Sequence, residues 1–226
     1  MALARSRVAA PLIVFEGPEG SGKSTQAVRL STRLRSEGIP VLLTRDPGGT
    51  AIGDKIRSLL LDSTSDALLG PTEAFLYAAA RAQLVGEVIR PALEAGTVVI
   101  SDRFVDSSLV YQGIGRGLTE AVVAAIQPLA TGGLEPNLRI LLDLPVGIGL
   151  ARRFATAEVN RLDREVASFH EAVRQGFLDR AAADGTGWVV LDGQKAEDDV
   201  AYAVYAEVWW RLGSPLSAAK QRVEGR

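Results

Sequence analysis

The 226-residue sequence contains no cysteine and a single histidine. The absence of cysteine excludes disulfides, thiolate metal sites and a cysteine nucleophile. No run approaches the ~18 apolar residues of a membrane-spanning helix, and the first residues lack the apolar segment of a secretory signal. The net charge of −2 provides no global positive field for DNA or RNA. We therefore expect a cytoplasmic protein without a membrane or nucleic-acid polymer partner.

What the sequence does contain is an ordinary globular composition, with 47% apolar and 23% charged residues. Short apolar runs predict five buried strands, at residues 12–15, 41–44, 98–100, 140–142 and 188–191. These runs lack apolar/polar alternation, which is typical of a parallel sheet covered on both faces. Segments with helical spacing, such as Ala27, Leu30 and Leu34, lie between them. The pattern predicts a doubly wound α/β fold.

No internal repeat or Pro/Gly-rich linker divides the chain, so we expect a single domain over residues 11–212. Residues 1–10 are predicted to form a flexible N-terminal tail, although their Arg, Ser and Ala content leaves a short transit peptide open. Residues 213–226 are polar and rich in Ser and Ala, which predicts a flexible tail at the C-terminus.

A glycine-rich motif follows the first predicted strand. Residues 17–24 read GPEGSGKS and satisfy the P-loop pattern G-x-x-x-x-G-K-[ST]. A strand before the motif and a helix after it place backbone N–H groups and a helix N-terminus around a phosphate. Lys23 is expected to reach the β- and γ-phosphates of ATP. The expected ATP-binding residues here are Gly17, Pro18, Glu19, Gly20, Ser21, Gly22, Lys23, Ser24 and Thr25.

The third predicted strand ends with Asp102 followed directly by Arg103. An acid at this strand end, beside the P-loop strand, is expected to bind Mg²⁺ together with the Ser24 hydroxyl. The Asp-Arg pair suits a site that holds a metal and a second phosphate; the alternative is a surface ion pair. Because the N-K-x-D and L-S-G-G-Q strings are absent, a GTPase or a transport ATPase is disfavoured.

Four separated segments resemble the thymidylate kinase family, in its lid-arginine, bacterial-type group. They are FEGPEGSGKSTQ (15–26), TRDPGGT (44–50), YAAARAQ (77–83) and DRFVDSSLVYQG (102–113). The likeness extends from about residue 11 to about residue 205. It implies a P-loop nucleoside monophosphate kinase fold, with a five-stranded parallel sheet, helices on both faces and a short lid. It also implies transfer of the γ-phosphoryl group of ATP to dTMP, which gives dTDP and ADP in dTTP synthesis.

The resemblance also implies an acceptor site for dTMP. In it Arg45 and Arg103 hold the phosphate, for which guanidinium forks are suited. Tyr77 stacks on thymine and Arg81, one helical turn later, reaches the base; by spacing alone Tyr77 is equally compatible with the core. Glu19 corresponds to a carboxylate near the acceptor 3′-hydroxyl and the metal. The remaining expected dTMP-binding residues are Asp46, Ser108, Tyr111 and Gln112, of which the tyrosine disfavours a ribose 2′-hydroxyl.

A stretch over about residues 152–165 resembles the lid of the family, which closes over ATP. Because glycine follows Glu19, the likeness is to members whose catalytic arginine lies in the lid. The expected catalytic residues are Lys23, Glu19, Arg103, Arg153 and Arg161, and Arg152 is expected to bind ATP. The family pattern D-R-x-E-x-E becomes NRLDRE here, so the choice among the lid arginines stays open, as does a solvated basic helix face.

Three further features are less specific. His170 lies in a polar helical segment and is expected to be exposed, because phosphoryl transfer depends mainly on positioning and charge neutralisation. Gln194 and Lys195 follow the last strand, where adenine would lie in this fold, or else form a helix-entry loop. The apolar face of residues 75–89 packs against a second subunit of a homodimer, as the family implies, or against the sheet.

Two rival functions follow from the same residues. One is a kinase for another nucleotide or for a deoxynucleoside. The other is a nucleotide-binding regulatory or assembly protein that has lost catalysis, which the altered lid allows. Intact Lys23, Asp102 and Arg103 disfavour the second rival. The expected partners are therefore ATP, dTMP and a second copy of the chain.

Overall fold

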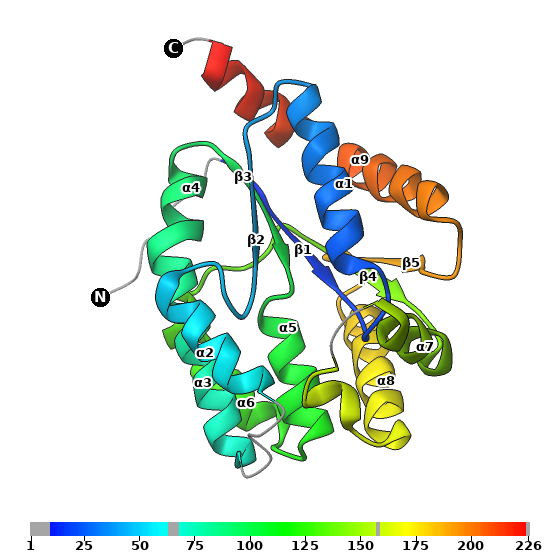
Figure 1. Cartoon of the computed structure of the whole chain (residues 1–226). Helices are drawn as coiled ribbons and strands as arrows, with labels where there is room; N and C mark the ends of the chain where they lie inside the picture. Colours follow the sequence, from blue (N-terminus) through cyan, green and yellow to red (C-terminus); the bar gives the residue numbers. More distant parts are fainter. Residues whose placement is uncertain (1–9, 63–67, 157–158, 225–226) are drawn as a thin grey trace.

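The computed structural model describes residues 10–62, 68–156 and 159–224. Within them, one sheet of five parallel strands has the order β2-β3-β1-β4-β5 (Figure 1). The strands are β1 (Leu12–Glu16), β2 (Val41–Arg45), β3 (Val98–Asp102), β4 (Leu138–Asp143) and β5 (Trp188–Asp192). Each contains a predicted strand and extends somewhat further. The predicted fold class is confirmed.

Helices occupy the connections between the strands. The α-helices are α1 (Lys23–Ser36), α2 (Ala51–Leu61), α3 (Gly70–Leu84), α4 (Arg90–Glu94), α5 (Val105–Ser108), α6 (Glu120–Thr131), α7 (Val146–Thr156), α8 (Ala167–Ala183) and α9 (Glu197–Glu224). Two π-helical segments, η1 (Val85–Ile89) and η2 (Leu109–Gly115), and a 3₁₀ turn, η3 (Leu162–Arg164), complete the elements. Among the helices of the described residues, none has both the length and the apolarity to cross a membrane.

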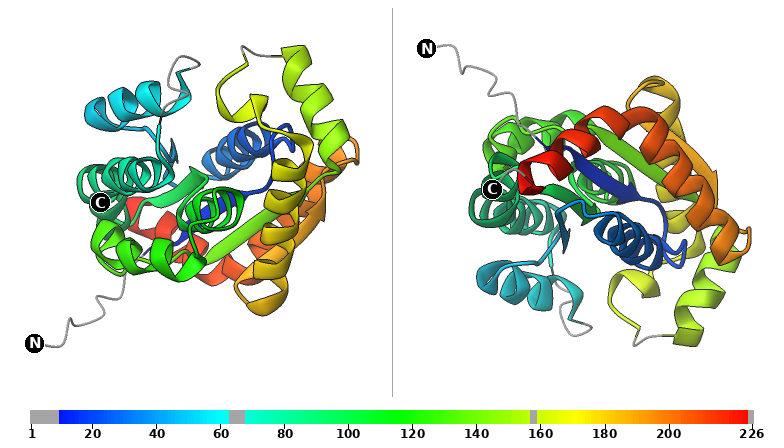
Figure 2. Two further views of the ribbon diagram at one scale, coloured as in Figure 1. Left: turned by 90° about the horizontal axis from the view of Figure 1, so that it is seen from below. Right: turned by 90° about the horizontal axis from the view of Figure 1, so that it is seen from above.

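Both faces of the sheet are covered, as the two views in Figure 2 show. Ile13 and Phe15 of β1 point toward the layer formed by α1 and α9. Leu12 and Val14 point the other way, into the layer of η1 and α4. Helix α8 and segment η2 cover the β4–β5 part of that second face. Alternate residues of β1 are thus buried on opposite faces, which explains why the strand is apolar throughout.

The carboxyl ends of the strands gather the functional loops at one edge of the sheet. β1 is central, between β3 and β4, and the P-loop follows it directly. Arg45 at the end of β2 is aligned with Asp102 at the end of β3. Asp143 at the end of β4 is aligned with Asp192 at the end of β5. Ligands of open parallel sheets bind at this edge, where the connections diverge to opposite faces.

The prediction of a flexible tail over residues 213–226 is wrong for the residues that the structure describes. Helix α9 continues through this stretch, and Leu216 and Ala219 are fully buried against the layer that contains α1. These small and apolar side chains recur at helical spacing, so the polar residues between them dominate the composition and mask the buried stripe. The predicted N-terminal tail, 1–10, lies outside the described residues except for Ala10, which is buried.

Candidate active site

A cavity of about 1250 Å³ opens at the carboxyl edge of the sheet. This volume exceeds the ~300–1,000 Å³ of a typical pocket for one small ligand, so two ligands fit side by side. The predicted site residues that line it are Glu19, Gly20, Ser21, Gly22, Lys23, Ser24, Thr25, Arg45, Asp46, Tyr77, Arg81, Asp102, Arg103, Ser108, Tyr111, Gln112, Arg152 and Arg153. Of the predicted site residues, all of which are described, Gly17, Pro18 and Arg161 are not part of this lining.

The backbone of the P-loop leaves no room for a side chain at Gly20. This residue has φ +69°, and a Cβ atom placed on it would lie 2.0 Å from the Gly149 carbonyl oxygen of α7. A left-handed backbone and a contact this close both require glycine. An arginine directly after Glu19 is therefore sterically excluded in this conformation.

Lys23 begins α1 and is held inside the loop. Its Nζ atom donates to the Pro18 carbonyl oxygen at 2.6 Å and to the Ser21 hydroxyl at 3.2 Å. Burial, and then the nearby charge of Arg103, lower the pKa of Lys23 to about 8. The loop thus concentrates positive charge that an anionic ligand would relieve.

Binding of Mg-ATP at about pH 9 should therefore take up close to one proton per site. With a pKa of about 8, Lys23 is mostly neutral at that pH in the free protein, and phosphate oxygens favour its charged form. Calorimetric titration in two buffers of different ionisation enthalpy measures the uptake. At about pH 7 Lys23 already carries its proton, so the uptake should nearly vanish. Equal uptake at both pH values would contradict the assignment.

Arg103 connects the P-loop with the end of β3. Its Nη1 atom donates to the Gly17 carbonyl oxygen and to the Ser107 hydroxyl, each at 3.1 Å. Its Nη2 atom lies 3.2 Å from Glu19 Oε1 and 3.1 Å from the Tyr111 hydroxyl. The Tyr111 hydroxyl in turn donates to the Glu19 carboxylate at 2.6 Å. The predicted residues of the phosphate and sugar end therefore form one hydrogen-bonded cluster.

Glu19 stays ionised within this cluster. Burial by itself raises the pKa of its carboxyl, but the neighbouring His170 and the charges of Arg103 and Lys23 outweigh burial and lower it to about 2. His170 Nδ1 lies 3.7 Å from Glu19 Oε2, and His170 is only 1% exposed. The prediction of an exposed His170 is wrong. Because α8 packs on η2 through Phe169 and Val173, the histidine between them is turned toward the P-loop.

Glu16 is a buried residue of the site that sequence reasoning missed. Its carboxylate accepts the Phe104 backbone N–H at 2.9 Å and the Ser107 hydroxyl at 2.6 Å. Burial, and then the charge of Asp106, raise its pKa to about 7. These contacts hold the turn in which Arg103 adopts φ 74°, a conformation that non-glycine residues rarely adopt. The sequence signal that could have identified Glu16 is a single acidic residue at the end of an otherwise apolar strand.

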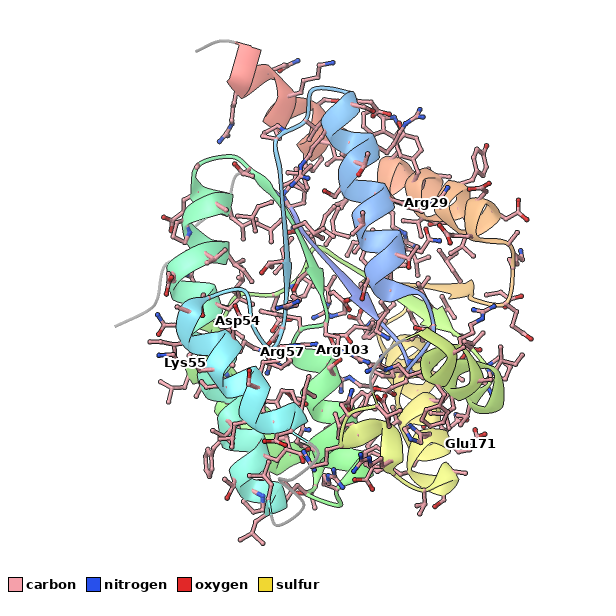
Figure 3. All side chains as sticks on the ribbon, viewed as in Figure 1. Arg29, Asp54, Lys55, Arg57, Arg103 and Glu171 are labelled. Carbon is pink, nitrogen blue, oxygen red and sulfur yellow. The ribbon has the colours of Figure 1, made fainter. Side chains whose placement is uncertain are left out.

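Three arginines, Arg45, Arg57 and Arg103, line the cavity, and Arg103 is the one that contacts the P-loop. Arg45 is largely exposed and pairs with Asp54 at 3.3 Å. Arg57 of α2, which sequence reasoning missed, donates to the Pro47 carbonyl oxygen at 2.9 Å. In Figure 3 Arg57 and Arg103 lie next to each other at the end of the sheet. Burial and then Arg45 lower the pKa of Arg57, so this group of cations is suited to an anion.

Arg81 is almost fully enclosed by acceptors. Its Nε atom donates to Asp46 Oδ2 at 2.5 Å, and Nη1 donates to Gln127 Oε1 at 2.5 Å. Its Nη2 atom donates to the Phe104 carbonyl oxygen at 3.1 Å and to the Ser108 hydroxyl at 2.9 Å. A guanidinium has five N–H donors, so one on Nη1 remains for a ligand. Sequence reasoning missed Gln127 because α6 carries no motif.

Tyr77 and Gln112 line the cavity close to this arginine. Tyr77 is 8% exposed and presents a ring to the lining. Gln112 Nε2 donates to Glu73 Oε1 at 2.7 Å. Gln112 Oε1 is buried and has no hydrogen-bond partner among the described residues. A buried carbonyl oxygen without a donor is costly, so it marks a position where a ligand N–H is expected. Glu73, the partner of Gln112, is a further residue that sequence reasoning missed.

The lid residues separate into two groups. Arg153 pairs with Asp163, at 2.9 Å from Nη2 to Oδ2, and both line the cavity. Arg161 instead turns away: its Nη2 atom lies 2.5 Å from Glu73 Oε2, and its Nε atom donates to the Leu60 carbonyl oxygen at 3.2 Å. The expected catalytic position of Arg161 therefore does not agree with its place in the structure. Residues 157–158 of the predicted lid lie outside the described residues.

The loop after β5 contributes to the cavity wall. Arg152 Nη1 donates to the Gly193 carbonyl oxygen at 2.8 Å, and both residues line the cavity. Lys195 lines it as well, whereas the Gln194 backbone N–H donates to Asp192 Oδ1 at 2.9 Å in a tight turn. Of the two residues considered for the adenine end, Lys195 is therefore the one placed at the cavity.

The oxygen atoms at the end of the P-loop fit a Mg²⁺ ion. The Ser24 hydroxyl donates to the Asp102 carboxylate, and both residues line the cavity. Mg²⁺ prefers oxygen ligands and is commonly held by one or two carboxylates together with substrate phosphates. Among the described residues no cluster of three or more acidic, His or Cys side chains forms a metal cage. The donor set thus matches a metal that binds together with a nucleotide.

The P-loop, a second group of cations beside it and a cavity with room for two ligands define an enzyme that passes a phosphoryl group between two nucleotides. On this sheet order, that is a P-loop nucleoside monophosphate kinase.

Comparison with known proteins is more specific. The thymidylate kinase family model matches residues 15–204. Thymidylate kinase of Thermomicrobium roseum is 51% identical over 197 residues, 87% of this chain and 93% of the relative. That of Deinococcus radiodurans is 47% identical over 197 residues, 87% and 95% of the two chains. The crystal structure of thymidylate kinase from Ehrlichia chaffeensis has a TM-score of 0.70 and 28% identity, covering 88% of this chain and 97% of that one. The chain belongs to the thymidylate kinase family and is an ATP-using phosphotransferase.

Proposed function

We propose that the cavity binds ATP over the P-loop and dTMP between the three arginines and Gln112, and that the γ-phosphoryl group passes directly to the dTMP phosphate. The observation that carries this proposal is that two complementary groups are present at the base end. Arg81 retains one N–H donor, and Gln112 Oε1 is buried and has no hydrogen-bond partner among the described residues. Thymine presents an N3–H donor and an O4 acceptor. Gln112 Oε1 offers the acceptor for N3–H, and Arg81 offers the donor for O4.

On the donor side, the P-loop amides and Lys23 bind the ATP phosphates. Arg152 and Lys195 border the adenine end. Mg²⁺, held by the Ser24 hydroxyl and by Asp102, would neutralise charge on the β- and γ-phosphates.

On the acceptor side, the cation cluster of Arg45, Arg57 and Arg103 holds the dTMP phosphate in line with ATP. Each guanidinium supplies charge-assisted hydrogen bonds to phosphate oxygens. The ionised Glu19 carboxylate accepts a hydrogen bond from the 3′-hydroxyl of the sugar. The Tyr111 hydroxyl is already committed to Glu19, so its ring leaves a 2′-hydroxyl without a partner, which favours deoxyribose.

In the lid, we assign Arg153 to the transferred phosphoryl group and Arg161 to structure. Arg153 lines the cavity, and the steric exclusion at Gly20 means that the P-loop does not supply an arginine at that position. Arg161 is held by Glu73 in a buried ion pair. Positioning and charge neutralisation supply most of the catalysis in phosphoryl transfer.

A homodimer is supported by the outer surface of α3 and α6, which pack against each other. The apolar face predicted over residues 75–89 is divided: Ile89 is buried against the sheet, whereas Phe75 is 62% exposed. Helix α6 adds Val122 and Leu129, which are 59% and 90% exposed. Exposed apolar side chains on two helices that pack together would suit a protein contact surface. We place the enzyme in the cytoplasm, where its substrate ATP is supplied.

A panel of acceptors tests the function. With ATP as donor, dTMP should give the highest kcat/KM, dCMP a value at least about 100-fold lower, and UMP an intermediate one. Cytosine reverses both the donor and the acceptor that Arg81 and Gln112 require, and each buried mismatch costs about 1–3 kcal/mol. Thymidine, which lacks the phosphate, should not react. ADP formation is measured by a coupled assay.

Two outcomes would contradict the proposal. Use of another acceptor without phosphorylation of dTMP would identify a different nucleotide kinase. Tight ATP binding with no ADP formed in the presence of dTMP would favour a regulatory nucleotide-binding protein.

A further inference from the structure

Gln112 is engaged at only one end of its amide. Its Nε2 atom donates to Glu73 Oε1 at 2.7 Å, while its Oε1 atom is buried and has no partner among the described residues. The two ends of a glutamine amide are nearly identical in shape and opposite in hydrogen bonding. Which end remains for a ligand is therefore decided by what the other end contacts.

Glu73 is the residue that decides it. Its side chain is fully buried, and Oε2 lies 2.5 Å from Arg161 Nη2 and 3.3 Å from Arg116 Nε. A carboxylate that faces two guanidinium groups is an acceptor at both oxygens. Only the NH₂ end of Gln112 can bond to such a neighbour. Turning the amide over would place two oxygens 2.7 Å apart, which is repulsive.

We propose that Glu73 sets the base specificity of the acceptor site by fixing Gln112 with its carbonyl oxygen toward the base. This inference rests on the proposed dTMP site. Position 3 of thymine carries an N–H donor, which Gln112 Oε1 accepts, whereas N3 of cytosine is an acceptor and meets an oxygen. Glu73 is not part of the described cavity lining, so it is a positioning residue that acts through Gln112.

The substitution Glu73→Gln tests the proposal. It keeps the size of the side chain, but its amide donates as well as accepts, so Gln112 becomes free to turn over. The probe is the 2′-deoxyribonucleotide of 5-methyl-2-pyrimidinone, which keeps the methyl group, has an acceptor at N3 and carries only hydrogen at carbon 4. The probe differs from dTMP at positions 3 and 4, but Glu73→Gln leaves the O4 donor Arg81 in place, so a change in the dTMP-to-probe ratio on substitution reports on position 3. The ratio of kcat/KM for dTMP to that for the probe should fall at least about 10-fold, mainly through the KM of the probe.

Arg116→Gln is the matched control. It removes one guanidinium from the same carboxylate and leaves the Glu73–Gln112 hydrogen bond in place, because Arg161 still pairs with Glu73. The ratio should stay within about twofold of wild type. In a Gln112→Leu background, adding Glu73→Gln should not change the ratio, because no amide remains to be oriented.

A purely structural role for Glu73 gives a different result: both substrates lose kcat/KM by the same factor and the ratio is unchanged, which overturns the inference. If thermal denaturation shows that Glu73→Gln is not folded, Glu73→Asp is used instead. The aspartate keeps the negative charge but moves the carboxylate away from Gln112 by one methylene. The ratio should again fall, and a folded Asp variant with an unchanged ratio also overturns the inference. Wild-type protein that does not phosphorylate dTMP refutes the proposed function instead.

Discussion

Arg153→Ala should lower kcat by about a thousandfold while KM for dTMP stays within about threefold. Arg153 lines the cavity from the lid, beside Asp163, whereas Gly20 leaves no space for an arginine in the P-loop. An arginine that neutralises the transferred phosphoryl group is worth about 10³–10⁵ in kcat. A group that acts mainly in the transition state lowers kcat and kcat/KM together. Steady-state kinetics with both substrates varied measures the two constants.

Arg161→Ala is the control, because this lid arginine is buried against Glu73. Removal of one partner from a buried ion pair costs about 3–5 kcal/mol, so the melting temperature should fall by about 10 °C. Its kcat, measured well below that temperature, should stay within about tenfold of wild type. The reverse pattern, with kcat lost in Arg161→Ala and kept in Arg153→Ala, would show that the roles of the two arginines are exchanged.

The sheet and the phosphate cradle were predictable because their signals are local. A buried parallel strand must be apolar on both faces, and the run at 12–15 shows this without any knowledge of its neighbours. The P-loop likewise depends on closely spaced glycines in one short segment between a strand and a helix. The acceptor roles of Arg45 and Arg103 were predicted from the family resemblance, and parallel pairing places the ends of their two strands side by side.

The supporting residues were not predictable in the same way, since each acts on a partner far along the chain. Glu16 holds a turn that begins at Phe104, and Gln127 of α6 holds Arg81 of α3. Such pairs depend on tertiary packing, and no local spacing reveals them. His170 was misjudged for a related reason: a helix with polar residues on most sides indicates no inward face, and packing on η2 decided it.

Three of the fully buried ionisable side chains share one structural role. Glu16, Glu73 and Arg81 have almost no exposure, and each is surrounded by partners of opposite hydrogen-bonding character. Burial of a charge is costly unless it is paired, so such groups are retained where geometry matters more than stability. In this protein each of them contacts a residue that lines the cavity, namely Ser107, Gln112 or Ser108.

Arg103→Ala should lower kcat/KM for dTMP by about a thousandfold. The guanidinium lies beside Glu19, and its removal takes two or more charge-assisted hydrogen bonds, each about 1.5–3 kcal/mol, from the acceptor phosphate. The dissociation constant of Mg-ATP, measured by calorimetry below pH 8, should change by no more than about threefold, because Lys23 and the loop amides remain. An equal loss of ATP binding would contradict an acceptor-side role.

The backbone at position 103 permits a control that separates charge from strain. Arg103 has φ 74°, which glycine adopts without penalty and alanine does not. Arg103→Gly should therefore be as inactive as Arg103→Ala and yet melt about 2–4 °C higher, since roughly 1 kcal/mol of strain is released. If Arg103→Gly recovered acceptor use, the loss in the alanine variant would reflect a displaced turn. Equal inactivity with unequal stability would instead assign the effect to the guanidinium, with Glu16 holding the turn around it.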